Sequence, residues 1–246
     1  MILFYGKNID YIILMEELYN MNIALILSGG TGTRLGSDIP KQYIKVNNKM
    51  IIGYCLETLI DNDNIDYIQI VADEAWHSEI EKESVNPKFK GFSKPGANRQ
   101  LSIYNGLTDI KKYADDDSFV LIHDAARPLL KDELINSCCE TLNVNSFYDG
   151  VLPVLPMKDT VYMSDDGKAV SSLLDRSKIY AGQAPEVFRL GKYYEANKAL
   201  LPEKILSING STEPAILSGM NIAMIPGDEG NFKITTMADL MRFKEM

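Results

Sequence analysis

Between Leu27 and Tyr43 the chain reads LSGGTGTRLGSDIPKQY, directly after an apolar run that begins at Asn22. The apolar run predicts a buried strand, and the glycines after it let backbone N–H groups approach a phosphate closely. A helix N-terminus near such a turn adds a favourable dipole for an anion. Arg34 and Lys41 bring fixed positive charge to the same place. The stretch therefore predicts a strand that ends in a triphosphate-binding turn.

Two common phosphate-binding motifs do not fit this turn. A P-loop requires Gly-Lys followed by Ser or Thr, and the chain contains no such tripeptide. A dinucleotide fingerprint requires G-x-G-x-x-G, whereas the glycines here stand at positions 30, 32 and 36. We therefore predict a different nucleotide-binding turn, formed by Ser28, Gly29, Gly30, Thr31 and Gly32.

Composition narrows the class of protein. The 246 residues suffice for one large α/β domain or two small ones, and 46% of them are hydrophobic. A net charge of −9 argues against general affinity for nucleic acid or for an anionic membrane. No apolar run is long enough to span a bilayer. Cys55, Cys138 and Cys139 lack a metal-binding spacing, and we expect reduced core thiols in a cytoplasmic protein.

The first residues differ from the rest of the chain. Lys7, Asp10 and Glu16 interrupt their apolar character, which argues against a signal peptide. Met21 stands directly before the first clear strand, so we expect Met21 to be the natural start and residues 1–20 to be an upstream extension. The domain boundary then separates an N-terminal extension at 1–21 from the remaining chain. An additional packed helix over 11–19 is the alternative. Residues 22–246 are then predicted to form a single domain.

Strand and helix patterns alternate along the remaining chain. Strands are predicted at 22–27, 67–72, 118–123, 150–155 and 221–225. Helices are predicted at 49–61, 76–83, 99–113, 131–142, 189–199 and 236–245. This alternation is typical of an α/β fold with a doubly wound, mostly parallel sheet. Ligands of such sheets bind at the carboxyl ends of the strands.

Residues of about 156–182 break that alternation. Polar and apolar positions alternate there around Asp165-Asp166-Gly167, which is a turn signal. The pattern predicts a β-hairpin arm inserted into the α/β core. Such an arm packs on its parent domain or embraces a second subunit, and the sequence leaves both open.

The segment HDAARP at 123–128 directly follows a buried-type strand, so it falls at a carboxyl end. Asp124 can hold a divalent metal or a substrate hydroxyl there, and Arg127 can clamp a phosphate. A structural pair of Asp124 and Arg127 that closes the loop is the alternative. His123 fits a packed strand-end residue better than a catalyst.

Other polar groups can be interpreted either as ligand-binding or as structural. Backbone N–H groups between Gly96 and Ser102, with the Ser102 hydroxyl, can read the edge of a base, while Asn98 can equally be only a helix cap. Lys233 stands between apolar residues, so it is either snorkelling or aimed at an anion. Arg176 lies in the arm, where a charge is usually just solvated.

Arg34, Lys41, Arg127 and Lys233 are candidate phosphate cations, and no obvious general base accompanies them. This combination fits transfer of a nucleotidyl group onto a phosphate. A phosphate monoester is already an anionic nucleophile near neutral pH, so it needs no deprotonation. The enzyme must instead align two anions that repel each other and stabilise charge on the transferring phosphorus. Mg²⁺ on the triphosphate is the expected helper.

The chain resembles a family of cytidylyltransferases that includes the methylerythritol phosphate enzyme of isoprenoid synthesis and the ribitol phosphate enzyme of teichoic acid synthesis. The matching segments are GGTGTR at 29–34, PKQ at 40–42, GANRQLS at 96–102, HDAARP at 123–128, DT at 159–160, DR at 175–176, GQAP at 182–185 and NFKITT at 231–236. They occur in family order and cover roughly residues 22–246. The resemblance implies a Rossmann-like nucleotidyltransferase fold. It also implies a reaction in which CTP and a polyol phosphate give a CDP-polyol and pyrophosphate, with Mg²⁺.

The resemblance further implies roles for individual residues. Those implied to be catalytic are Arg34, Lys41 and Lys233. Those implied to bind the nucleotide, besides the glycine turn, are Gly96, Arg99 and Ser102. Those implied to bind the acceptor are Asp124, Arg127, Thr160, Arg176 and Thr212, with Asp124 also near the metal. The arm residues among them act partly across a homodimer in this family.

Departures from the family pattern bear on the acceptor. Ala184 stands where the family commonly has Thr, and Thr212-Glu213 stands where it usually has Thr-Asp. The Ser28-Gly29-Gly30 turn and the YAGQ segment at 180–183 look more like the ribitol phosphate branch. We therefore expect ribitol 5-phosphate or a related envelope or capsule polyol phosphate. Methylerythritol 4-phosphate is the alternative.

Two more distant functions are alternatives to a polyol phosphate cytidylyltransferase. A sugar-1-phosphate nucleotidyltransferase has a similar glycine-rich loop and a Pro-Lys, but the HDAARP and NFKITT segments argue against it. A non-catalytic module would bind CTP without releasing pyrophosphate. Retention of both Arg34 and Lys41 argues against that module, because these cations serve the transition state more than resting affinity.

Overall fold

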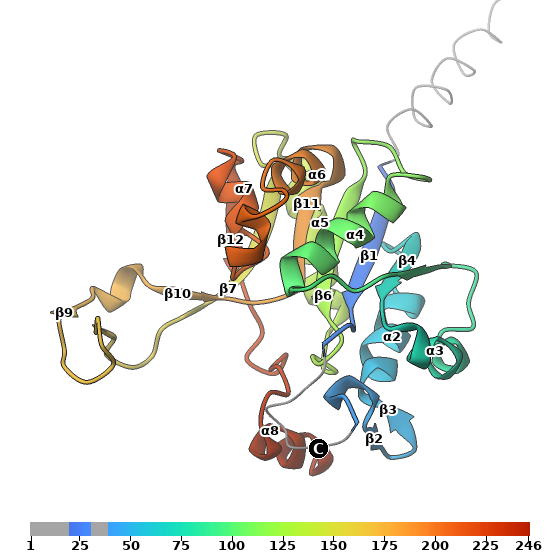
Figure 1. Ribbon diagram of the computed structural model, residues 1–246, viewed down its shortest axis with the longest axis horizontal. Helices are drawn as coiled ribbons and strands as arrows, with labels where there is room; N and C mark the ends of the chain where they lie inside the picture. The colour runs from blue at the N-terminus through green and yellow to red at the C-terminus, as the bar shows by residue number, and fades with distance from the viewer. Residues whose placement is uncertain (1–19, 31–38) are drawn as a thin grey trace, which may run out of the picture.

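A computed structural model describes residues 20–30 and 39–246 of the chain (Figure 1). The predictions for residues 1–19 and for Thr31, Gly32 and Arg34 therefore lie outside the described residues. The described part is built on an eight-stranded sheet in the order β10-β7-β11-β6-β1-β4-β5, with β12 also paired to β7.

The strands of this sheet are β1 (Asn22–Leu27), β4 (Tyr67–Val71), β5 (Phe89–Ser93), β6 (Phe119–Asp124), β7 (Gly150–Pro156), β10 (Tyr180–Gly182), β11 (Glu186–Arg189) and β12 (Ile222–Pro226). β1 is parallel to β4 and β6, β5 is parallel to β4, and β12 is parallel to β7. β11 is antiparallel to β6 and β7, and β10 is antiparallel to β7. The predicted α/β fold is confirmed, and β5 and β11 are strands that the sequence patterns missed.

The helices are α2 (Ile51–Asp61), α3 (His77–Glu83), α4 (Arg99–Ile110), α5 (Asp132–Val144), α6 (Leu190–Lys198), α7 (Glu213–Leu217) and α8 (Met237–Lys244). Short 3₁₀ turns are η2 (Lys41–Tyr43), η3 (Glu74–Trp76), η4 (Arg176–Lys178) and η5 (Lys204–Ser207). All six predicted helices are present, and α7 was missed because it has only five residues. Within the described ranges, no helix has the length and apolar character needed to cross a membrane.

The side chains of β1 show that helices cover both faces of the sheet. Ile23 and Leu25 are buried with residues of α4, α6 and α7. Ala24 and Ile26 are buried in a second cluster with residues of α2, α3 and α5. A strand buried on both faces has no polar alternation, which is why residues 22–27 read as one continuous apolar run. The three cysteines are free and buried, as predicted.

The arm extends away from the sheet (Figure 1). Its strands β8 (Tyr162–Met163) and β9 (Ser172–Leu173) pair in antiparallel fashion, as the hairpin pattern predicts. Gly167 has a φ of +70°, so the turn uses the left-handed conformation that glycine adopts readily. Residues 180–182, the end of the predicted arm, form β10 in the central sheet instead. A separate short pair, β2 (Lys45–Val46) and β3 (Lys49–Met50), follows η2.

Candidate active site

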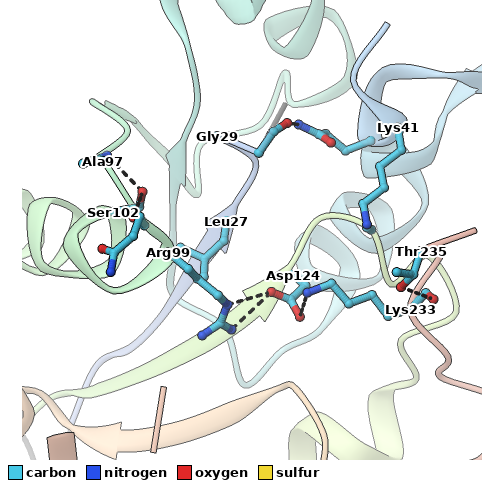
Figure 2. A pocket seen from close by; sticks show the side chains of 14 residues that line it. Leu27, Gly29, Lys41, Ala97, Arg99, Ser102, Asp124, Lys233 and Thr235 are labelled. Carbon is cyan, nitrogen blue, oxygen red and sulfur yellow. Dashed lines mark hydrogen bonds and ion pairs between the residues drawn. The ribbon is translucent and has the colours of Figure 1, made fainter. Parts of the chain in front are cut away.

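The carboxyl ends of β1 and β6 border one cavity, which has a volume of about 440 Å³ (Figure 2). The two strands are parallel neighbours, and their last residues Leu27 and Asp124 are paired in register. This is the edge at which the sequence places a ligand. The described residues that line the cavity are Leu27, Gly29, Gly30, Lys41, Gln42, Gly96, Ala97, Asn98, Arg99, Ser102, Asp124, Ala126, Lys233 and Thr235.

Two side chains beside Lys41 hold its turn against the glycines. Gln42 Nε2 donates to the carbonyl oxygens of Ser28 and Gly30, each at 2.7 Å. The Tyr43 hydroxyl donates to the Ser28 carbonyl at 2.8 Å. Figure 2 shows the Lys41 side chain pointing into the cavity, toward the side where Asp124 and Lys233 lie. The PKQ segment therefore fixes a cation at the glycine turn.

Asp124 binds three cations at the base of the cavity. Its Oδ1 accepts from Arg99 Nε and Nη2, both at 3.2 Å. Its Oδ2 lies 3.0 Å from Lys233 Nζ and 3.5 Å from Arg127 Nε. Burial alone raises the pKa of Asp124, but the charges of Arg99, Lys233 and Arg127 outweigh it and hold that pKa far below its usual range. Asp124 is therefore ionised.

Arg99 and Arg127 each make a second contact that fixes a loop. Arg99 Nη1 donates to Ser211 Oγ at 2.8 Å, so its guanidinium joins Asp124 to the loop before α7. Arg127 Nη1 donates to the Asn231 carbonyl at 2.7 Å. The structural pair of Asp124 and Arg127 considered from sequence is thus present. Arg127 is not among the described residues that line the cavity.

The GANRQLS segment folds back on itself at the start of α4. The Gly96 N–H donates to Ser102 Oγ at 2.9 Å, and Ser102 Oγ donates to the Asn98 carbonyl at 2.8 Å. Asn98 Oδ1 accepts from the Leu101 N–H, which confirms its role as helix cap. A Cβ on residue 96 would lie only 2.6 Å from Leu101 Cβ, so this close approach requires glycine.

The structure keeps several predicted site residues away from this cavity. Ser28 is buried, and its hydroxyl donates to the Tyr43 hydroxyl at 2.9 Å. Thr212 is also buried, and its hydroxyl donates to Glu186 Oε2 at 3.0 Å. Thr160 and Arg176 are exposed on the arm, where Arg176 Nη1 donates to the Lys158 carbonyl. None of these four is among the described lining residues.

The structure also adds residues that the sequence did not mark. Glu186 is a buried carboxyl, and desolvation raises its pKa although Arg99, Ser211 and Thr212 act in the opposite direction. Ser211 Oγ accepts from Arg99 Nη1, and the Ser211 side chain also hydrogen-bonds Glu186. No local pattern marks either residue, because their partners are distant in sequence. Gln42, Ala97 and Thr235 lie inside quoted segments, so proximity to a motif was the available signal.

The family model of 2-C-methyl-D-erythritol 4-phosphate cytidylyltransferase, IspD, matches residues 22–245. The chain belongs to the IspD family. It is therefore a nucleotidyltransferase, and the resemblance stated from its motifs is confirmed.

Individual relatives carry two different acceptor names. A ribitol-5-phosphate cytidylyltransferase of Vibrio parahaemolyticus is 33% identical, over 91% of this chain and 94% of that protein. A 2-C-methyl-D-erythritol 4-phosphate cytidylyltransferase of Clostridium beijerinckii is 34% identical, over 89% and 94%. The chain spans 53% of a bifunctional IspD/IspF enzyme of Wolbachia pipientis, at 31% identity. The solved Francisella tularensis IspD superposes with a TM-score of 0.78 at 26% identity, covering 92% of this chain and 99% of that one.

The IspD-family site can be tested for its fit to Mg²⁺. In nucleotide sites Mg²⁺ takes one or two carboxylates and draws its other ligands from phosphates and water. Among residues 20–30 and 39–246, no three His, Cys, Asp or Glu side chains gather in a way that could hold a metal ion. Asp124 is the one carboxylate among the described residues that line the cavity, so it is the residue that would hold an ion arriving with the nucleotide.

His123 of this IspD-family protein is buried beside Asp124 rather than exposed to the cavity. Its Nε2 lies 3.1 Å from the Arg127 carbonyl, which only accepts, so Nε2 carries the proton. Its Nδ1 has no hydrogen-bond partner among the described residues. Burial lowers the pKa of His123 to about 4. The ring is therefore neutral and structural at physiological pH.

We expect a pH-dependent stability that originates from His123. The unfolded chain takes up a proton near the ordinary histidine pKa of about 6.5, whereas the folded chain does so only at about 4. The free energy of unfolding is therefore highest above the unfolded-state pKa of about 6.5. It falls by about 1.4 kcal/mol per pH unit as the pH drops from there toward the folded-state pKa of about 4. Urea unfolding across the window checks this. His123→Gln should show a shallower slope, and equal slopes in the two proteins would contradict the assignment.

Proposed function

We propose that this cytidylyltransferase uses CTP and a polyol phosphate, with ribitol 5-phosphate or a related envelope or capsule polyol phosphate as its acceptor. The observation that carries the cytidylyl transfer is Asp124, which binds Arg99, Arg127 and Lys233 at a cavity bordered by the glycine turn and Lys41. The Ser28-Gly29-Gly30 turn, the YAGQ segment and the relative from Vibrio parahaemolyticus support the ribitol branch.

The proposed reaction exchanges one P–O bond for another. An oxygen of the acceptor phosphate forms a bond to the α-phosphorus of CTP, and the bond from that phosphorus to pyrophosphate breaks. The acceptor phosphate is already anionic, so no general base is required. The cations offset repulsion between the two substrates and the charge that develops on the transferring phosphorus. Lys41 and Lys233 are proposed to act there, together with Arg34, which lies outside the described residues.

Lys233 is suited to this task because it is both held and accessible. Its Nζ lies 3.0 Å from Asp124 Oδ2, and its side chain is 33% exposed. An ion pair that fixes the lysine before the substrates bind lowers the cost of ordering it during the reaction. Mg²⁺ bound with the nucleotide, with Asp124 as its protein ligand, would supply further positive charge against the phosphate oxygens.

The opposite wall of the cavity is proposed to bind the nucleoside. Gly96, Arg99 and Ser102 line this cavity, and Figure 2 shows Arg99 and Ser102 across it from Lys41. The backbone of Gly29 and Gly30 borders the space between these walls. This arrangement supports cytosine and ribose recognition on one side and phosphate chemistry on the other.

The arm is proposed to complete the acceptor site within a homodimer. Its side chains Tyr162, Met163, Val170 and Leu173 are between 48% and 66% exposed, which is unusual for apolar residues gathered on one small hairpin. Thr160 and Arg176 are proposed to bind the acceptor from this arm, and Thr212 is proposed to lie on the acceptor side of the site. A mass of one chain by light scattering would contradict the dimer.

Buried free cysteines support a cytoplasmic location.

Pyrophosphate release with CTP and Mg²⁺ tests the proposed function directly. Ribitol 5-phosphate and methylerythritol 4-phosphate are compared as acceptors, with UTP as the control donor. We expect release with CTP and a preference for ribitol 5-phosphate. CTP binding without release with either acceptor would contradict the reaction itself.

Methylerythritol 4-phosphate is the second candidate acceptor. The matching family model and the relative from Clostridium beijerinckii both carry that name. A preference for this acceptor in the same assay would replace the ribitol proposal while leaving the cytidylyl transfer intact.

A further inference from the structure

A buried amide joins the end of β10 to the loop that precedes Lys233. Gln183 directly follows β10, and only 4% of its surface is exposed. Its Nε2 donates to the Asp228 carbonyl at 2.8 Å and to the Asn231 carbonyl at 3.3 Å. Its Oε1 accepts from the Asp228 N–H at 2.9 Å. Both ends of the amide therefore bind the same short loop.

That loop is also fastened on its other side. Asn231 is fully buried, and its Nδ2 donates to the Ala184 carbonyl at 2.8 Å. Its carbonyl accepts a second hydrogen bond from Arg127 Nη1 at 2.7 Å. The Ile234 N–H donates to the Ala126 carbonyl at 2.9 Å. The backbone that carries Lys233 is thus held before and after the lysine.

Close packing at Gly227 shows that the amide has little room to move. A Cβ on residue 227 would lie 3.0 Å from Gln183 Oε1 and 3.2 Å from the Val154 carbonyl oxygen. The Gly227 N–H already donates to that carbonyl at 2.9 Å. A side chain at residue 227 would therefore displace the Gln183 amide or the loop.

We infer that Gln183 is a positioning residue, which sets the place of Lys233 through the loop at 227–231. A neutral amide both donates to the Asp228 carbonyl and accepts from its N–H, which neither an ionised carboxylate nor an aliphatic side chain can do. The GQAP segment then serves phosphate chemistry through the backbone. The inference rests on the proposed function, because it requires Lys233 to act in the transfer.

A double-mutant cycle with Gln183→Met and Lys233→Met tests the inference. Gln183→Met should lower turnover between about 10-fold and 100-fold, because small displacements of a reacting group are costly. The KM for CTP should change less than about threefold. In the Lys233→Met background, Gln183→Met should have no further effect on turnover, since no lysine remains to be positioned.

Two further variants provide an independent test and a control. Gly227→Ala would shift the same amide, or the loop that it binds, by a few tenths of an ångström. It should also lower turnover, and this loss should disappear in the Lys233→Met background. It serves if Gln183→Met does not fold. Gln69→Met is the matched control, because Gln69 is a buried amide in β4 that binds Ser93 Oγ at 2.9 Å. This control should keep full turnover per folded molecule.

The possible results separate the inference from the proposed function. Normal turnover in Gln183→Met, or an undiminished effect in the Lys233→Met background, would overturn the positioning role alone. Normal turnover in Lys233→Met would overturn both the proposed role of Lys233 and the inference that depends on it. A loss that disappears in the Lys233→Met background supports the positioning role.

Discussion

Lys41→Ala is expected to lower turnover with CTP about 10²–10³-fold, the effect of removing one preorganised electrostatic stabiliser. Lys41 lines the cavity on a 3₁₀ turn that Gln42 and Tyr43 fasten to the glycine turn. Its charge is therefore in place before the substrates bind. A cation of this kind serves the transition state more than the ground state, so the KM for CTP should change far less than turnover.

Steady-state pyrophosphate release measures both constants for Lys41→Ala. Lys41→Arg should recover part of the turnover, because the charge is kept while its geometry changes. Lys45→Ala is the matched control, since Lys45 is exposed and lies outside the described lining of the cavity. Near-normal turnover in Lys41→Ala would remove this lysine from the mechanism.

Asp124→Asn is expected to reduce both stability and turnover. Removing one partner of a buried ion pair costs about 3–5 kcal/mol. The lower end, about 3 kcal/mol, applies here because the Arg99 and Lys233 side chains are 30% and 33% exposed and can regain water. The amide NH₂ would also face cationic donors. Turnover should fall about 100-fold, because Lys233 loses its partner and the nucleotide-bound Mg²⁺ loses its proposed protein ligand.

Urea unfolding and steady-state kinetics together check the Asp124 prediction. Asp149→Asn is the matched control, because Asp149 is also a buried carboxylate in an ion pair, with its Oδ1 2.5 Å from Lys192 Nζ. Neither residue is among the described residues that line the cavity. It should lose stability and keep turnover. The pKa of Asp124 is lowered, so its contribution to stability is present above about pH 4 and lost below. An Asp124→Asn protein with normal turnover would contradict the proposed role.

The parts of the fold that could be predicted from sequence are those with local signals. The apolar run at 22–27 forms β1 with the predicted bounds, because a strand covered on both faces needs apolar residues throughout. The glycines after it mark where the backbone borders a cavity. Helix α4 begins where Asn98 offers a cap. Such signals depend on neighbours within a few residues.

Two strands of the central sheet, besides β10, were not predicted, and each has a physical reason. β5 contains Lys90 and Gly91, and Gly91 has a φ of +137° beside a register shift against β4, so its pattern is irregular. β11 has four residues and begins with Glu186, whose burial is made possible by Thr212, 26 residues later. A short apolar run that begins with a charged residue does not predict a strand in the centre of a sheet.

The orientation of the site residues was beyond local patterns as well. Arg99 was expected beside the nucleotide, and it lines the cavity. Its guanidinium also contacts Asp124 and Ser211, which lie 25 and 112 residues away, and local patterns did not predict these contacts. Gln183 was noted only as part of a motif, although its amide binds a loop 45 residues further on. Hydrogen bonds of this kind depend on strand order, which sequence spacing does not reveal.

The root of the arm has an evolutionary consequence. The chain leaves the sheet after Pro156 and returns at Tyr180, and these two residues are paired in register. The Met157 N–H bonds to the Ile179 carbonyl at 3.2 Å, so both ends of the excursion meet at one point. An excursion whose ends already touch can be lengthened, shortened or exchanged at little entropic cost to the rest of the chain. Recombination at this root would exchange one family member's arm for another's and leave the catalytic core intact.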